Sequence, residues 1–122
     1  MQDPPSAVEL IEAVQGFLEQ TALPELEGRA AFHARVAINA LAIVARELQH
    51  APAANHAETL RLRHLLSPSA APGAVESLSL LDLNRELCRR IRAGEIGLEN
   101  AELCEHLWQT TLAKRAIDAP PR

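Results

Sequence analysis

The stretch RAAFHARVAINALAIVAREL, residues 29–48, constrains the fold more than any other part of the sequence. It contains no glycine or proline, and its many alanines are the strongest helix formers. It is apolar almost all the way round, which is typical of a helix at the centre of a bundle. Yet Arg29, His33, Arg35 and Asn39 lie within its first three turns, where burial requires a partner for each polar group.

The rest of the composition agrees with a helical fold. Of the 122 residues, 48% are hydrophobic, which is enough for one domain with a core that needs no metal or disulfide. Aromatic residues make up 2%, and alanine and leucine dominate, which favours helices over sheets.

The chain divides into helical segments at its prolines, glycines and capping residues. Ser6 and Glu9 form a capping box, Pro52 is expected to stop the second helix, and Gly94 suits the position after a helix end. The expected helices span about 6–20, 29–50, 55–66, 80–93 and 99–117. We therefore predict an all-α, single-domain bundle of about five helices, three of them long, one short and one medium.

One helical domain is expected to occupy residues 1–122. Residues 1–5 are predicted to be a loose arm, 67–77 a flexible loop rich in proline, serine and alanine, and 118–122 a frayed tail. No signal peptide or membrane-spanning run is recognisable, and the two cysteines form no disulfide pattern. We therefore expect a cytoplasmic protein in which Cys88 and Cys104 are reduced and fill the core.

Polar side chains fall on or beside the apolar faces of three expected helices. This candidate polar cluster consists of His33, Arg35, Asn39, Asn84, Lys114 and Asp118. Thr110 falls on the same stripe of the last helix as Lys114. The cluster is interpreted first as a hydrogen-bonded network that fixes helix register, and alternatively as a polar pocket that binds a ligand or a partner's side chain.

A second candidate is the basic stripe formed by Arg85, Arg89 and Arg92 on one face of the fourth helix. Three guanidinium groups on one face can bind phosphates or carboxylates. The alternative is an ordinary solvated face near a helix C-terminus, where the helix dipole favours positive charge.

Several classes of function are disfavoured. The net charge of −4 gives no general attraction to nucleic acid or to an anionic membrane. The five histidines have no metal-ligand spacing, and no phosphate loop, nucleophile elbow or dinucleotide fingerprint is present. We expect no metal and no cofactor, and an enzyme is disfavoured. The remaining enzymatic hypothesis uses His33 as a general base beside Lys114 or Asp118.

Three stretches carry a resemblance to a known family: FHARVAINALAIVAREL (32–48), LNRELCRRIRAGE (83–95) and TTLAKRAIDAP (110–120). In these the chain resembles a small bacterial family of uncharacterised function. The genes of that family often lie beside those of an aminoglycoside-phosphotransferase-like kinase and an acyl-CoA dehydrogenase. The matching positions include all six residues of the candidate polar cluster and Arg92, but the family supplies no catalytic residue.

The resemblance implies a helical accessory or interaction protein that binds such a kinase or dehydrogenase in acyl-CoA catabolism. The alternative is a binding module for an anionic small molecule, such as an acyl-CoA or a phosphorylated acyl group. A homodimer is compatible with each hypothesis, because small bundles often pair about a twofold axis.

Overall fold

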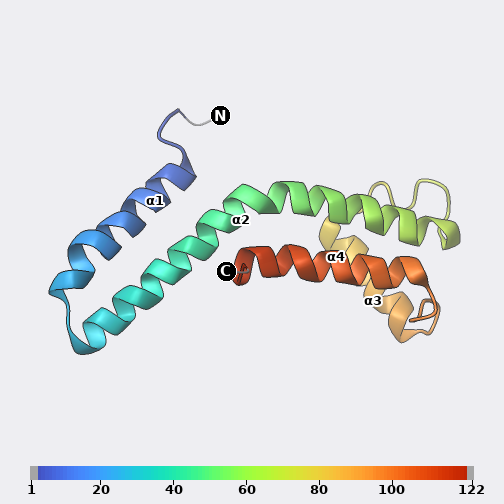
Figure 1. Ribbon diagram of the computed structural model, residues 1–122. Helices are drawn as coiled ribbons and strands as arrows, with labels where there is room; N and C mark the ends of the chain where they lie inside the picture. Colours follow the sequence, from blue (N-terminus) through green and yellow to red (C-terminus); the bar gives the residue numbers. More distant parts are fainter. Residues whose placement is uncertain (1–2, 121–122) are drawn as a thin grey trace. The chain divides into compact units, whose positions relative to one another are not determined.

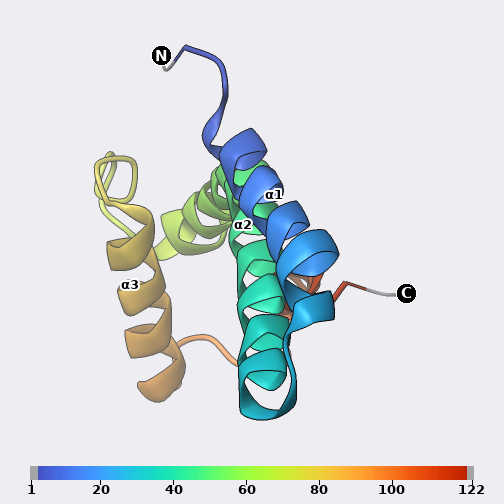
Figure 2. The same ribbon diagram turned by 90° about the vertical axis from the view of Figure 1, so that its left-hand side faces the viewer.

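The computed structural model describes residues 3–120, and these contain four α-helices and no strand. The helices are α1 (Ala7–Phe17), α2 (Gly28–Leu66), α3 (Leu80–Arg92) and α4 (Ala101–Asp118). Figures 1 and 2 show them in two views. The all-α class is confirmed. The number of helices is not five but four, because the second and third expected helices form one continuous helix.

Pro52 lies inside α2 and does not end it. A proline removes one backbone hydrogen bond and crowds the preceding turn, but neighbouring alanines and the leucines that follow keep the segment helical. No helix begins at Asn55, where the third helix was expected to start. The Asn55 carbonyl instead accepts a 2.8 Å hydrogen bond from the Thr59 hydroxyl within the helix.

Most of the other helix ends follow the expected chemistry. Ser6 and Glu9 form the capping box, with both bonds at 3.2 Å. Gly94 has a φ of +75°, and the amides of Gly94 and Glu95 donate to the carbonyls of Ile91 and Arg90. These two backbone hydrogen bonds are the pattern of a Schellman motif. They confirm Gly94 as the residue that follows the helix end.

The chain separates into two compact units at the proline of α2. Unit 1 is Met1–Ala51 and unit 2 is Pro52–Arg122. Residues 1–51 contain seven acidic side chains and three arginines, whereas residues 52–122 contain nine of each sign. The formal charge of −4 therefore resides entirely in unit 1.

Unit 1 is a helical hairpin with very little core. Helix α1 continues through a π-helical turn (Leu18–Ala22) and a 3-10 turn (Leu23–Glu25), then the chain reverses into α2. In both views α1 runs antiparallel beside the first part of α2 (Figures 1 and 2). Among its described residues only Ala31, Ala34 and Ala45 are buried. Alanine buries little apolar area, so this hairpin gains little hydrophobic stabilisation from its own packing.

The expectation that residues 29–48 form a buried central helix is wrong. Phe32 is 60% exposed and Val36 is 51% exposed, and His33, Arg35 and Asn39 are also exposed. The apolar residues surround the helix, but within unit 1 only α1 is available to cover them. One neighbouring helix covers one stripe, and the other apolar side chains remain in contact with solvent.

Unit 2 has a conventional core. It is built from the end of α2, the segment that follows it, α3 and α4. The buried apolar residues are Leu62, Leu65, Leu66, Val75, Leu83, Leu87 and Leu103. Val75 is 3% exposed and Ala70 packs against the same core, so the segment 67–77, which was predicted to be a flexible loop, contributes side chains to this core.

The cysteines are placed differently from the prediction. Cys88 and Cys104 are both free thiols and both exposed. Each lies at the edge of its helix's apolar face, where one step of 100° moves a side chain from core to solvent.

Candidate functional site

A layer of polar side chains crosses unit 2 between α2, α3 and α4. The Asn84 amide on α3 donates to Glu58 Oε1 on α2 at 3.1 Å. It also donates to the Leu80 carbonyl of its own helix at 3.1 Å. The carboxylate of Glu58 can only accept hydrogen bonds, and the Asn84 amide provides it with a donor. This contact fixes the register of α3 against α2.

Arg61 continues the layer from α2 to α4. Its Nε lies 3.4 Å from His106 Nδ1, and its Nη2 donates to the Thr110 hydroxyl at 3.3 Å. His106 is 3% exposed. Burial lowers the pKa of His106, the Arg61 charge lowers it further, and the Glu58 carboxylate acts in the opposite direction. A neutral His106 that accepts at Nδ1 holds its proton on Nε2.

A groove of about 430 Å³ lies beside this layer, between α2 and α4. Its lining residues are Leu60, Arg61, His64, Leu65, Glu102, Glu105 and His106. At its rim His64 Nδ1 lies 3.2 Å from Glu102 Oε2, and these side chains are 75% and 59% exposed. The lining holds one guanidinium against two carboxylates, so the groove does not concentrate positive charge for an anion.

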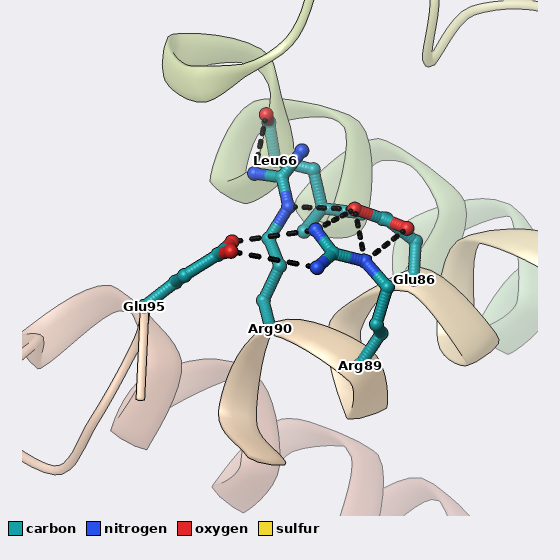
Figure 3. Close-up of polar contacts among 5 residues, drawn as sticks. All are labelled: Leu66, Glu86, Arg89, Arg90 and Glu95. Carbon is teal, nitrogen blue, oxygen red and sulfur yellow. Dashed lines mark hydrogen bonds and ion pairs between the residues drawn. The ribbon is translucent and has the colours of Figure 1, made fainter. Parts of the chain in front are cut away.

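A second polar assembly holds α3 against the end of α2 (Figure 3). Arg90 is 5% exposed, and its Nη1 donates to the Leu66 carbonyl at 2.9 Å. Its Nε donates to Glu86 Oε1 at 2.9 Å. The last carbonyls of an α-helix have no hydrogen-bond donor within their own helix. Arg90, which lies on α3, therefore provides a donor for one of these carbonyls at the end of α2.

Arg89 completes this assembly on the exposed side. Its guanidinium lies 2.8 Å from Glu86 and 3.3 Å from Glu95. The hydrogen bonds from Arg89 and Arg90 lower the pKa of Glu86 from 4.5 to about 2. The pKa of Arg89 is raised by its bonds to Glu86 and Glu95. Four charged groups therefore balance one another, and through Arg90 this assembly is linked to the end of α2.

The basic stripe is consequently not a set of three available cations. Arg89 is held between two glutamates, and Arg85 lies 3.4 Å from Asp82 on its own helix. Arg92 is exposed. The proposal that these arginines bind an anion stays a prediction, and two of its members already have carboxylate partners.

The candidate polar cluster is divided between the two units. His33, Arg35 and Asn39 lie on the surface of unit 1. In unit 2, Asn84 is half-buried against Glu58, whereas Lys114 and Asp118 are exposed on α4. The α2 side chains that meet Asn84 and Thr110 come from the segment after Pro52, not from residues 29–48.

The sequence interpretation therefore overlooked Glu58, Arg61 and His106. His106 falls on the apolar stripe of the last helix, one turn from Leu103 and Thr110. Glu58 lies one turn before Leu62 and two turns before Leu65, and Arg61 lies one turn before Leu65. This spacing is a usable signal for inward-facing polar side chains on residues 55–66.

Two features are absent from the described residues. Within 3–120, no three His, Cys, Asp or Glu side chains gather closely enough to hold a metal ion. No helix in that range is both long and apolar enough to cross a membrane.

Unit 1 offers a surface of another kind. Eight of its large apolar side chains are exposed by 37% to 60%: Leu10, Val14, Phe17, Leu26, Phe32, Val36, Val44 and Leu48. Single exposed leucines are normal on proteins, but a concentration of such residues on a unit whose described residues bury only alanines is typical of an interaction surface.

Comparison with protein families finds one match. Residues 24–121 match the family described as Domain of unknown function (DUF6285). The matched region includes α2, α3 and α4, and α1 precedes it. Comparison with curated proteins and with solved structures finds no match.

Proposed function

The chain belongs to the DUF6285 family, and we propose that it is an accessory protein that acts by binding another protein through unit 1. The observation that carries this proposal is the missing core of unit 1. Its described residues bury three alanines and expose eight large apolar side chains. A hairpin of this composition becomes stable when a partner covers its apolar surface.

The face of α1 is the proposed binding surface. Leu10, Val14 and Phe17 follow at intervals of four and three residues and are 47%, 51% and 57% exposed. These three residues form what is called the α1 stripe below. They lie within about 60° of one another on the helix and so form one continuous apolar strip.

Charge indicates the chemistry of the partner. Residues 7–22 contain Glu9, Glu12 and Glu19 and no lysine or arginine. A partner that covers the α1 stripe is therefore expected to present an apolar groove with basic side chains at its rim. Since α1 precedes the residues that match the family, this surface is proposed for this chain rather than for every member.

The resemblance of the sequence supplies the proposed partner class. We propose an aminoglycoside-phosphotransferase-like kinase or an acyl-CoA dehydrogenase of acyl-CoA catabolism. The accessory role requires no catalytic group in this chain, which agrees with the structural roles of Arg61, Arg89 and Arg90. The groove in unit 2 has a net negative lining and gives no comparable support to an anion-binding role.

The test is a calorimetric titration of the purified full chain with an aminoglycoside-phosphotransferase-like kinase and with an acyl-CoA dehydrogenase of the same organism. We expect one of them to bind, and the double variant Val14→Glu, Phe17→Glu to weaken binding at least about tenfold. The matched control is Leu98→Glu, because Leu98 is 80% exposed but lies in unit 2. It should bind as the unchanged protein does.

Two results would contradict the proposal. One is the failure of both enzymes to bind at protein concentrations of about 100 μM. The other is equal binding by the α1 stripe variant and the unchanged protein, provided circular dichroism shows the same helix content.

A further inference from the structure

The first part of α2 carries an exposed stripe with the spacing of a coiled coil. Phe32, Val36, Asn39 and Ile43 follow at intervals of four, three and four residues. These four residues are called the α2 seam below. Phe32 and Val36 are 60% and 51% exposed, Asn39 is exposed and Ile43 is half-buried. Alternation of three and four is the pattern by which one helix packs into the side chains of another.

The α2 seam is separate from the other apolar surface of the same helix. At 100° per residue, Phe32, Val36 and Ile43 lie within about 40° of one another, whereas Val44 lies about 80° or more from each of them. The buried alanines Ala31, Ala34 and Ala45 lie on a further side. The seam therefore needs a partner other than α1.

Asn39 indicates which partner this is. A single asparagine within an apolar seam costs stability unless another hydrogen-bonding side chain faces it. An amide both donates and accepts, so the amide of a second Asn39 satisfies it. A twofold axis through this position brings the two asparagines together, because each residue on such an axis faces its own copy.

The charged residues beside the seam select the orientation. Arg29, His33 and Glu47 are exposed on the same side of α2, within about 40° of one another. In a parallel pair, this flank of α2 would face the opposite flank of the partner's seam, so Glu47 would not meet Arg29 or His33. In an antiparallel pair centred on Asn39, Glu47 lies eight residues beyond the centre and meets the partner's segment between Arg29 and His33. The antiparallel pair therefore places opposite charges together at both ends.

We propose that two copies of this chain pair antiparallel along the α2 seam, with Asn39 facing Asn39 across the twofold axis. This inference rests on the proposed function in assigning unit 1 to protein binding, but it uses a different stripe. It also explains the polar residues of an otherwise apolar helix: Asn39 sets the register, and Arg29 and His33 meet Glu47. The seam lies within the residues that match the family.

The first test is analytical ultracentrifugation of the full chain over a range of concentrations. We expect a reversible monomer–dimer equilibrium, and we expect Val36→Glu to raise the dimer dissociation constant at least about tenfold. The control is Leu98→Glu, an equivalent change on unit 2, which should leave the constant unchanged. Since Val36 is exposed, the variant should have the same helix content as the unchanged protein at a concentration where both are monomers. A monomer at about 100 μM, or equal effects of the two variants, would overturn the inference.

The second test examines register and orientation. In a background with Cys88→Ser and Cys104→Ser, an Asn39→Cys chain should form a disulfide-linked dimer under mild oxidation. The matched Phe32→Cys chain should form much less, because antiparallel pairing separates the two copies of residue 32 by about 20 Å along the helices. Equal crosslinking at both positions would contradict antiparallel pairing.

The outcomes distinguish this inference from the proposed function. Loss of dimerisation in Val36→Glu with enzyme binding retained would support both. A monomeric protein that still binds its enzyme through the α1 stripe would overturn the dimer alone. A dimer that binds neither enzyme would contradict the proposed function alone.

Discussion

At the scale of single residues, Arg90 has the clearest structural role. Its buried guanidinium pairs with the Leu66 carbonyl and with Glu86. Replacement by methionine keeps the bulk but leaves that carbonyl without its donor, and we expect Arg90→Met to lower the free energy of unfolding by roughly 2–4 kcal/mol. Urea denaturation measures this. Arg92→Met, on the exposed side of the same helix, should change the free energy of unfolding by less than about 0.5 kcal/mol. An equal loss of stability in both variants would contradict the role of Arg90.

His106 makes stability depend on pH. Its pKa in the folded protein lies below 6.5, so the unfolded chain binds the proton more readily. The stability contributed by the neutral ring is complete above pH 6.5 and is lost as the pH falls through the lower pKa of the folded state. Thermal unfolding between pH 7.5 and 5 should therefore show a falling midpoint. His106→Gln should make the unfolding midpoint depend less on pH. His64→Gln, which replaces an exposed ring, should leave the pH dependence of the midpoint unchanged.

At the scale of helices, the end of α3 shows how much local sequence determines. Gly94 adopts a φ of +75°, which costs a residue with a side chain about 1–2 kcal/mol. We expect Gly94→Ala to destabilise unit 2 by that amount in urea denaturation. Gly16→Ala is the control, and it should stabilise the protein. Gly16 lies inside α1 with open space around it, and alanine has a higher helix propensity than glycine. Stabilisation by Gly94→Ala would contradict the Schellman assignment.

Local chemistry predicted the helix class, the Ser6 cap and the Gly94 end, because each depends on residues a few positions apart. It failed at Pro52, where a proline was expected to stop α2 and the helix continues. It also failed for residues 29–48, since an apolar pattern shows which side chains could be buried and not whether a neighbour covers them. Asn84 and Thr110 were identified by spacing, but their partners Glu58 and Arg61 depend on how α2 packs on α3 and α4.

At the scale of the whole molecule, the two units differ in what supports them. Unit 2 buries seven apolar side chains and holds its helices together through the polar layer and the Arg90 assembly. Unit 1 buries only alanines among its described residues and carries the formal charge of the chain. Unit 2 has a core of its own, whereas unit 1 is proposed to depend on proteins that would cover the α1 stripe and the α2 seam.

Hydrogen exchange of the full chain, measured by mass spectrometry at about 1 μM and about 100 μM, tests this dependence most directly. We predict that amides of residues 7–50 exchange rapidly at the lower concentration and become protected at the higher one, because binding stabilises unit 1 by mass action. Amides of residues 60–117 should be protected equally at both. Strong protection of residues 7–50 that does not change with concentration would contradict the account, because unit 1 would then be stable without a partner.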